Sequence, residues 1–230
     1  MKKMTMVLAV LTMAVGAKAQ VYVQGGYNLA NITNNNQGQT EKNGWLSTFN
    51  VGLMSRFGIS KTFDLETGAI FTGRGAKAET YFNGGADYIK TKFNPTYIEV
   101  PLNAVIKIPL SVKGESNVFF HAGPYLAIGV GGTSVANSKF GPLTSNSSTA
   151  VKFSNDDPFT SQQDDAAYNK LKRFDFGANI GGGIDFGKLL VKVNYGFGLA
   201  KINSTQSNNS VNDKNKYRTL SFSVGIPLGR

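Results

Sequence analysis

Eight segments of this 230-residue sequence alternate apolar and polar residues with the period of a β-strand. In a strand, a two-residue period sends successive side chains to opposite faces. Each segment is long enough for a tilted strand that crosses a lipid bilayer, which needs about 9–11 residues. The pattern therefore predicts an all-β fold of eight long strands, at residues 21–31, 44–57, 63–75, 97–110, 118–132, 174–186, 189–202 and 217–228.

The two faces of these segments carry opposite chemistry. In residues 97–110, Ile98 and Val100 share one face, whereas Glu99 and Asn103 point to the other. A soluble β-sandwich would bury the apolar face and wet the polar one. A membrane barrel turns apolar groups toward lipid and polar groups toward the lumen. In a barrel, the polar network of the lumen would comprise Arg56, Asp64, Glu66, Arg74, Glu99, Asn103, Lys107, His121, Asp175, Asp185, Lys192 and Arg218.

The connections between the segments favour the barrel because short and long ones alternate. The short ones are residues 58–62, 110–117 and 187–188, and the long ones are 32–43, 76–93, 133–173 and 203–216. Outer-membrane barrels have this asymmetry, and closure into a barrel removes the sheet edges. We predict an eight-stranded antiparallel transmembrane β-barrel with short periplasmic turns, long extracellular loops and periplasmic termini. The alternative is a secreted or periplasmic sandwich or lipocalin-like barrel.

The first 19 residues have the layout of a cleaved secretory signal peptide. Lys2 and Lys3 precede an apolar run from Met6 to Val15, and small residues flank Lys18. This layout predicts Sec export, cleavage after Ala19 and a mature barrel at residues 20–230. Because the sequence has no cysteine, the exported chain has to be stabilised by its core and its hydrogen-bond ladder, without disulfides.

The formal net charge of +10 falls to +7 when Lys2, Lys3 and Lys18 leave with the signal peptide. A basic chain can bind nucleic acid, but the Lys and Arg residues are scattered and the chain is expected to be exported. We therefore expect no nucleic-acid partner. The positive charge suits the outer membrane of a Gram-negative bacterium, with outer-membrane lipid and lipopolysaccharide as partners.

The lumen of an eight-stranded barrel is about wide enough for side chains to fill. Its predicted polar set has near-balanced charge, and an unpaired charge in such a space would be costly. We expect Arg56 to pair with Asp64 or Glu66, and Arg74 to pair with Glu99. Such ion pairs would plug the barrel.

Two other features concern the strands themselves. Pro101 lacks an N–H group, so it should lie at a bulge or cost one hydrogen bond of the ladder.

Aromatic residues near the strand ends suit girdles at the membrane interfaces, although strands are enriched in aromatics in any case. These residues are Trp45, Phe57, Phe63, Phe93, Tyr97, Phe119, Phe186 and Tyr217.

The sequence gives little support for catalysis. His121 is the one histidine, with Asp175 or Asp185 expected near it, and no motif brings a nucleophile, a base and an orienting group together. The acidic stretch 155–165 lacks the Gly-centred spacing of an EF-hand loop. We therefore expect no enzyme activity, no cofactor and no metal site.

The longest connection, residues 133–173, is unusual for its apolar content. Connections of this length are usually functional or disordered, and a purely solvating loop has little use for large apolar side chains. We expect these side chains either to extend the fifth and sixth strands above the membrane or to contact other outer-membrane proteins. The candidate contact residues are Phe140, Leu143, Phe153, Phe159 and Tyr168.

Four stretches resemble the PorT-like outer-membrane β-barrel family of Bacteroidota: "GGYNLAN", "YIEVPLNAVIK", "AGPYLAIGVGG" and "NYGFGLAKI". The most distinctive is the Tyr-apolar-Glu-apolar-Pro-Leu signature at residues 97–102. The resemblance covers nearly all of the mature chain and implies an eight-stranded barrel in the outer membrane. One namesake of the family serves the type IX secretion system. The chain departs from many outer-membrane barrels at its C-terminus, because it ends in "IPLGR" and not in an aromatic residue.

These observations favour a non-enzymatic barrel that acts as a scaffold or accessory subunit of a larger cell-envelope assembly, such as one for secretion or transport. A small-solute pore or ligand-binding barrel is the alternative. A lipid-modifying outer-membrane enzyme comes third.

Overall fold

The computed structural model describes residues 19–36, 39–41, 43–110, 116–154, 170–202 and 215–228. The predicted signal peptide, apart from Ala19, lies outside these residues. The elements are β1 (Ala19–Asn36), β2 (Gln39–Glu41), β3 (Leu46–Gly58), β4 (Phe63–Gly73), β5 (Ala76–Phe82), the 3-10 turn η1 (Asn83–Gly85), β6 (Asp87–Pro109), β7 (Asn117–Phe140), β8 (Leu143–Ala150), β9 (Lys152–Ser154), β10 (Lys170–Lys172), β11 (Phe174–Asp185), β12 (Leu190–Gly198) and β13 (Lys216–Pro227).

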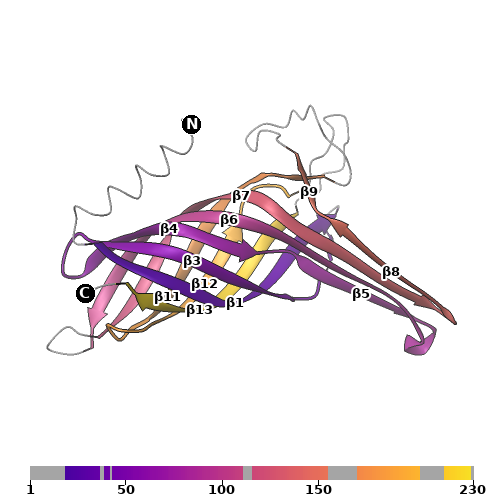
Figure 1. Ribbon diagram of the computed structural model, residues 1–230, viewed down its shortest axis with the longest axis horizontal. Helices are drawn as coiled ribbons and strands as arrows, with labels where there is room; N and C mark the ends of the chain where they lie inside the picture. The colour runs from indigo at the N-terminus through magenta and orange to yellow at the C-terminus, as the bar shows by residue number, and fades with distance from the viewer. Residues whose placement is uncertain are drawn as a thin grey trace.

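Eight of these strands close into an antiparallel ring, as Figure 1 shows. The order around the ring is β1, β3, β4, β6, β7, β11, β12 and β13, and β13 pairs back with β1. Each ring strand overlaps one of the eight alternating segments. The predicted eight-stranded β-barrel is therefore confirmed, and closure leaves no free edge within the ring.

The two ends of the barrel differ. Tyr22 of β1 pairs with Pro227 of β13, so the first and last described strands start and finish at the same end, here called the terminal end. The strand ends that flank the short connections, between β3 and β4, β6 and β7, and β11 and β12, lie at this end. The strand ends that flank the long connections lie at the opposite, distal end. This asymmetry is the one that the sequence predicts.

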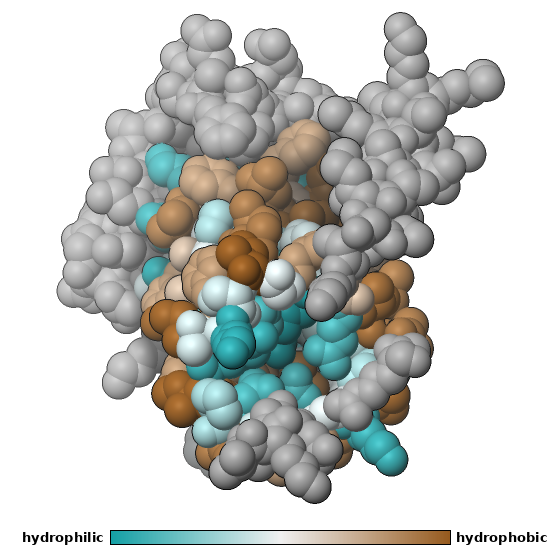
Figure 2. Space-filling model, turned by 90° about the vertical axis from the view of Figure 1, so that its left-hand side faces the viewer, coloured by the Kyte–Doolittle hydropathy of each residue, from teal (hydrophilic) through white to brown (hydrophobic). Residues whose placement is uncertain are grey.

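The side chains of the ring alternate between a polar lumen and an apolar outer wall. On β6, Ile98 and Val100 are exposed, whereas Glu99 and Asn103 are buried. Seen from the terminal end, hydrophilic residues gather near the centre of the molecule and hydrophobic residues lie at its sides (Figure 2). Within the described ranges, no helix is both long and apolar enough to cross a membrane.

Strands β6 and β7 are 23 and 24 residues long because they continue past the ring at the distal end. There β5 pairs with β6, β6 pairs with β7, and β7 pairs with β8. We call these parts the projecting sheet: β5, residues 87–96 of β6, residues 131–140 of β7, and β8 (Figure 1). At about 3.3 Å per residue, it reaches about 30 Å beyond the ring along the strands. Residues 76–93 and 133–154 are thus largely strand.

Pro101 interrupts the pairing of β4 with β6. The register runs to Thr67↔Leu102 and resumes at Ile70↔Glu99 without a shift, so the ladder loses pairing opposite Pro101 and does not bulge. The hydroxyl of Thr67 donates a hydrogen bond of 2.7 Å to the Pro101 carbonyl across this gap. The register shift of β6 against β7 lies elsewhere, at Thr96 and Tyr97, where the projecting sheet begins.

Large rings on β7 face glycines on β11 inside the barrel. Phe119 is opposite Gly183, and His121 is opposite Gly181. A Cβ atom on Gly183 would lie 2.7 Å from Cζ of Phe119, and one on Gly181 would lie 2.6 Å from Cε1 of His121. The glycines therefore provide the space in which the rings lie flat against β11.

Candidate functional site

Near the terminal end, the lumen is organised around the fully buried carboxylate of Glu66. It accepts hydrogen bonds from Arg56 at 2.8 Å, Lys192 at 2.5 Å, the Tyr22 hydroxyl at 2.8 Å and the Asn103 amide at 3.3 Å. Two cations and two neutral donors thus share one carboxylate, as expected for a buried charge that has to be fully compensated.

The remaining charges of this region are also paired. A second carboxylate, that of Asp185, lies 3.6 Å from Arg56. The guanidinium of Arg56 also lies 4.4 Å from the centre of the Phe119 ring. At the terminal rim, the partly exposed ammonium of Lys107 lies 2.6 Å from Asp64. This half of the lumen therefore contains a cluster around Glu66 and a separate ion pair at the rim.

A second cluster lies toward the distal end, around the buried guanidinium of Arg74. Arg74 forms ion pairs with both Glu99 and Asp175. The Tyr125 hydroxyl donates to Asp175 at 3.0 Å, and its ring centre lies 4.6 Å from the guanidinium. Tyr97 lies under the same cation, at 5.3 Å.

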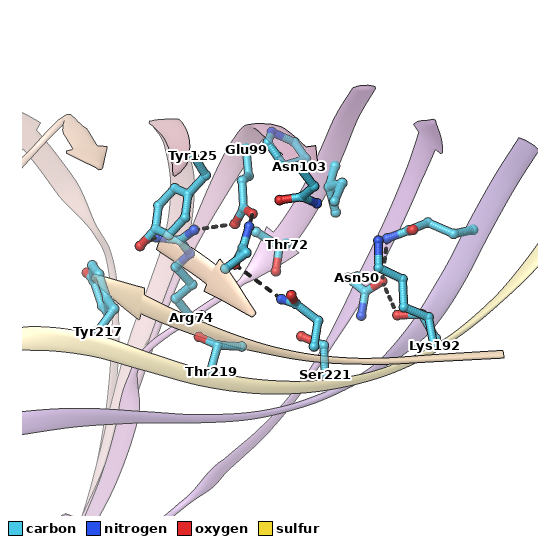
Figure 3. A pocket seen from close by; sticks show the side chains of 17 residues that line it. Asn50, Thr72, Arg74, Glu99, Asn103, Tyr125, Lys192, Tyr217, Thr219 and Ser221 are labelled. Atoms are coloured by element: carbon cyan, nitrogen blue, oxygen red, sulfur yellow. Dashed lines mark hydrogen bonds and ion pairs between the residues drawn. The ribbon is translucent and has the colours of Figure 1, made fainter. Parts of the chain in front are cut away.

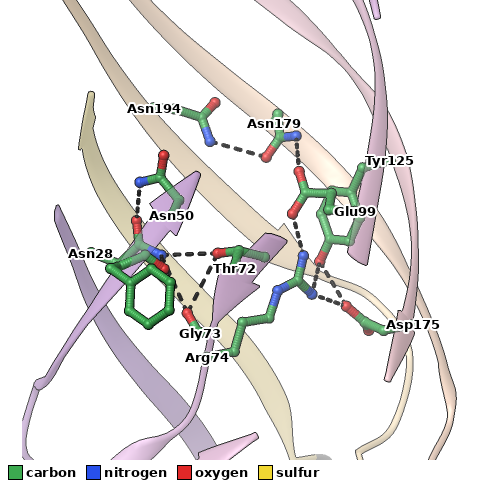
Figure 4. Close-up of polar contacts among 11 residues, drawn as sticks. Asn28, Asn50, Thr72, Gly73, Arg74, Glu99, Tyr125, Asp175, Asn179 and Asn194 are labelled. Carbon is green, nitrogen blue, oxygen red and sulfur yellow. Dashed lines mark hydrogen bonds and ion pairs between the residues drawn. The ribbon is translucent and has the colours of Figure 1, made fainter. Parts of the chain in front are cut away.

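Amide side chains extend the cluster around Arg74 across the barrel, as Figure 4 shows. Asn179 donates to Glu99 at 2.8 Å, and Asn194 donates to Asn179 at 3.2 Å. His121 shares a 2.9 Å hydrogen bond with Asn194. The lumen therefore contains one network that crosses from β6 through β11 to β12 and back to β7.

Between the two charged clusters lies a small polar cavity, shown in Figure 3 with Lys192 on one side and Arg74 on the other. Its volume is about 40 Å³. Since one water needs at least about 10–15 Å³, the cavity has space for a few waters and not for a solute that has to pass through.

An apolar cluster covers the distal end of this network. Tyr97 and Tyr217 are buried with their hydroxyl oxygens 3.2 Å apart, and Leu171 of β10 packs in the same cluster. Phe153 of β9 is edge-to-face with Tyr97, with ring centres 5.6 Å apart. A Cβ atom on Gly129 would lie 2.2 Å from the Phe153 ring, so this glycine lets the ring approach the β7 backbone.

The structure brings together most of the predicted lumen residues. Arg56 pairs with Glu66, and Arg74 pairs with Glu99, as expected. The buried set on the inner face is Arg56, Asp64, Glu66, Arg74, Glu99, Asn103, His121, Asp175, Asp185 and Lys192, with Lys107 partly exposed.

Arg218 is a correction to this set. Arg218, Leu220 and Phe222 are two residues apart along β13, so their side chains lie on the same face of the strand. Leu220 and Phe222 belong to the outer wall, and Arg218 therefore points away from the lumen. It donates to the carbonyl of Gly198 at 2.9 Å, and its guanidinium lies 5.8 Å from the centre of the Phe197 ring.

The predicted aromatic girdle is also corrected in part. Trp45 and Phe186 are exposed on the outside of the barrel, as a girdle requires. Tyr97, Phe119 and Tyr217, in contrast, are buried in the lumen, where they contact the two arginines. The sequence analysis missed this role, although all three share strand parity with lumen residues such as Glu99 and His121.

His121 does not have the carboxylate neighbours that the sequence suggests. The carboxylates of Asp175 and Asp185 pair with the two arginines and not with His121. Among the residues that the structure describes, no group of three or more His, Cys, Asp or Glu side chains is arranged to hold a metal ion. The acidic stretch 155–165 lies outside the described residues.

The predicted contact residues of 133–173 separate into different environments. Phe140 and Leu143 are exposed at the far end of the projecting sheet, whereas Phe153 is half-buried in the apolar cluster. Phe159 and Tyr168 lie outside the described residues. Phe153 therefore helps to cover the distal end of the lumen.

The projecting sheet has two different faces. The face continuous with the lumen carries four exposed apolar residues at its far end, which we call the tip patch: Phe82, Ile89, Phe140 and Leu143. The rings of Phe82 and Phe140 come from different hairpins, with centres 6.1 Å apart. Asp87 joins the two hairpin ends, because its carboxylate accepts from the Asn83 amide at 2.6 Å and from Gly141 N–H at 2.7 Å.

The opposite face, continuous with the outer wall, is basic and aromatic. Tyr81 and Tyr88 pair across β5 and β6, and Lys90 lies 5.2 and 4.7 Å from their ring centres. The Tyr81 hydroxyl donates to Glu79 at 2.8 Å, which lowers the pKa of this carboxyl. Further lysines of this face, Lys77 and Lys92, are directly opposite each other nearer the barrel.

A closed antiparallel ring with an apolar wall and an ion-paired polar lumen defines a transmembrane β-barrel of a Gram-negative outer membrane. The chain belongs to the outer membrane protein beta-barrel domain family, whose model matches residues 13–204.

Several solved structures are similar to the chain. Ail of Yersinia pestis, solved in complex with the heparin analogue sucrose octasulfate, is 11% identical, with 91% of this chain and 99% of Ail covered and a TM-score of 0.39. Neisserial surface protein A is 10% identical, with 91% and 99% covered and a TM-score of 0.40. OprG of Pseudomonas aeruginosa is 12% identical, with 92% and 97% covered and a TM-score of 0.38. No curated protein sequence matches the chain.

Proposed function

We propose that this protein is a non-enzymatic membrane anchor that displays the projecting sheet as a docking surface for other outer-membrane proteins. It would act as an accessory subunit of a larger cell-envelope assembly, such as one for secretion or transport, in a bacterium of the Bacteroidota. The observation that carries the proposal is the contrast between a lumen filled by ion pairs and a projecting sheet with exposed apolar groups.

The lumen offers little that a pore or an enzyme would need. Its charged groups are committed to one another, and its cavity of about 40 Å³ is too small for a solute to pass. His121 is hydrogen-bonded to an amide and has neither Asp175 nor Asp185 as a partner. A pore or ligand-binding barrel is therefore the second candidate, and a lipid-modifying enzyme is the third.

The projecting sheet has two features that suit protein partners. The first is the tip patch, in which Leu143 is 75% exposed, because contiguous exposed apolar groups commonly mark interaction sites. The second is β8, which pairs only with β7 among the described strands. Its sequence, "LTSNSSTA", has no charge or proline to block strand addition, which leaves an edge that an extended partner segment can join.

The proposal requires the distal end to lie outside the cell and the termini to lie in the periplasm, after Sec export. Since the chain has no cysteine, single cysteines report topology without interference. Ser147→Cys in β8 should react with an impermeant maleimide in intact cells, and Lys61→Cys in the β3–β4 turn should react only after lysis. Labelling of Lys61→Cys alone in intact cells would reverse the orientation.

The test of function removes the projecting sheet without disturbing the ring. Because Lys77 is opposite Lys92 and Ser134 is opposite Thr149, Asn-Gly can replace residues 78–91 and residues 135–148 as two-residue hairpin turns. We call this double replacement the trimmed variant. Tagged full-length protein should co-purify specific outer-membrane proteins from mild detergent, and the trimmed variant should lose them while its folded band still shifts on heating in gels.

A paired point test separates the tip patch from the rest of the sheet. Phe82→Ser with Phe140→Ser should weaken co-purification, whereas Tyr81→Ser with Tyr88→Ser, on the opposite face of the same sheet, should not. Retention of every partner by the trimmed variant would refute the proposal.

A further inference from the structure

The outer wall of the barrel continues directly into one face of the projecting sheet. On β6, the alternation that exposes Ile98 and Val100 to lipid sends Thr96, Asn94 and Lys92 to the same side. Thr96 and Lys92 are four residues apart, or about 13 Å along the strand at 3.3 Å per residue. Lys92 therefore lies just beyond the apolar part of the wall, where lipid headgroups are expected.

At this height the structure forms a groove, which we call the rim groove. It is lined by Trp45 beside β3, Lys77 of β5, and Lys92 and Asn94 of β6, with a volume of about 260 Å³. Trp45 is 45% exposed. An amphipathic indole at this position is typical of residues that lie at the membrane–water interface.

Backbone contacts hold Trp45 and Lys77 next to each other. Gly44 N–H donates to the Lys77 carbonyl at 2.7 Å, and Lys77 N–H donates to the Gly44 carbonyl at 3.2 Å. A Cβ atom on Gly44 would lie 2.9 Å from Cγ of Lys77, so the glycine allows the lysine stem to pack closely. The two backbone hydrogen bonds between Gly44 and Lys77 therefore fix the wall of the groove, which does not depend on long side chains alone.

The charges of the groove are incompletely compensated within the described part of the chain. Lys77 has an ion pair with Glu79 at 3.5 Å. Lys92, directly opposite Lys77, forms no ion pair with a described residue. Lys90 differs, because its ammonium lies over the two tyrosine rings farther up the same face. Two adjacent ammonium groups with one carboxylate leave a net positive site.

We propose that the rim groove binds the phosphate-bearing sugar headgroup of an outer-leaflet lipid, of the lipopolysaccharide class. Lys77 and Lys92 would contact the phosphate as point charges, Trp45 would lie against the sugar, and Asn94 would hydrogen-bond its hydroxyls. The inference uses the proposed orientation, because only the distal end carries this groove. It identifies a lipid for the outer side of the barrel, whereas the proposed function concerns proteins at the tip patch and β8.

Trp45 is the only tryptophan of the chain, so its fluorescence reports on the rim groove directly. Bisphosphorylated lipid A titrated into the detergent-solubilised protein should change the emission of Trp45 and reach saturation. Dephosphorylated lipid A and inorganic phosphate, at the same concentrations, should not. If inorganic phosphate alone reproduces the change, the site binds free anions and the lipid assignment fails.

The decisive variant is Lys77→Gln with Lys92→Gln. We expect it to weaken lipid A binding about 30-fold, the ratio that corresponds to about 1 kcal/mol per lysine near an anionic surface. Lys61→Gln with Lys188→Gln removes the same charge at the terminal end and should leave binding unchanged. Equal affinity of the two double variants would overturn the proposal.

A further comparison keeps this inference separate from the proposed function. The trimmed variant loses Val135 from the lining of the groove but retains the proposed contact residues Trp45, Lys77, Lys92 and Asn94. It should therefore still bind lipid A although it loses its protein partners. Conversely, Lys77→Gln with Lys92→Gln should keep those partners. Loss of lipid A binding in a trimmed variant that still shifts on heating would contradict the rim groove as the site.

Discussion

Glu66 is the residue on which the terminal half of the lumen depends. Its carboxylate accepts hydrogen bonds from Arg56, Lys192, Tyr22 and Asn103. A buried cation that loses its partner carries the full cost of its desolvation. The four donors come from β3, β12, β1 and β6, so this one acceptor also joins strands that are distant around the ring.

We predict that Glu66→Gln destabilises the barrel strongly, because it leaves Lys192 without its counter-charge and Arg56 with only the more distant Asp185. The expected loss is about 3–5 kcal/mol. Urea unfolding in lipid vesicles, followed by Trp45 fluorescence, measures it. Glu79→Gln removes an exposed carboxylate from the projecting sheet and should leave the free energy of unfolding nearly unchanged. Similar values for the two variants would show that the buried network does not stabilise the barrel.

Much of the lumen can be predicted at the residue scale, and the misses have one physical cause. Residues such as Glu99 and Asn103 were identified because they are polar and share a face. The polarity of Arg218 suggests the lumen, but its position along β13 places it on the same face as Leu220. The aromatic rings suggest the membrane interface for Tyr97, Phe119 and Tyr217, but their positions along the strands place them on the lumen face. The position of a residue along a strand decides whether its side chain faces the lumen or the lipid. Tyrosine suits both environments because it joins an apolar ring to a hydroxyl.

At the scale of strands, β7 and β11 fit together through complementary size. The Phe119 ring lies against Gly183, where a Cβ atom would be 2.0 Å from the carbonyl oxygen of Val191. Such a contact involves backbone, so it cannot be relieved by a side-chain rotation. Gly181 and Gly183 belong to this packing arrangement of the lumen, whereas Gly182 lies on the outer-wall side, next to Phe120.

We predict that Gly183→Ala costs about 1–3 kcal/mol, the usual range for overpacking a filled interior. Gly25→Ala is the matched control, because it lies in β1 and a Cβ atom there would have nothing within 4 Å. The control should be neutral or slightly stabilising, since glycine weakens a strand interior. Unfolding midpoints in urea compare the two, and an equal effect at both positions would disprove the packing account.

The strand boundaries show where the sequence stops being informative. Hydrophobic alternation marks the part of each strand that lies in lipid, and there the predicted and observed strands agree. The sequence predicts long connections at residues 76–93 and 133–173, with strand extension above the membrane as one alternative for 133–173. Most of residues 76–93 and 133–150 are strand. Their sheet is exposed on both faces, so it needs no continuous apolar side, and the two-residue period has no hydrophobic signal to reveal it.

At the scale of the whole molecule, a closed ring separates two tasks. The apolar wall and the ion-paired lumen suit the proposed membrane anchor, and the five lumen carboxylates Asp64, Glu66, Glu99, Asp175 and Asp185 each lie in an ion pair. In the proposed function, the exposed groups of the projecting sheet at the distal end contact the partners. If the ring anchors the protein and the projecting sheet binds partners, the barrel does not need an open path through its centre.

The most direct test of this account is the conductance of the pure full-length protein in planar lipid bilayers. With two ion-paired clusters in the lumen and a cavity of about 40 Å³ between them, the barrel should give no sustained current steps at moderate voltage. Insertion can be verified in the same preparation by the heat-dependent gel shift. Stable, uniform and large single-channel steps from verified protein would contradict the closed barrel and favour the pore.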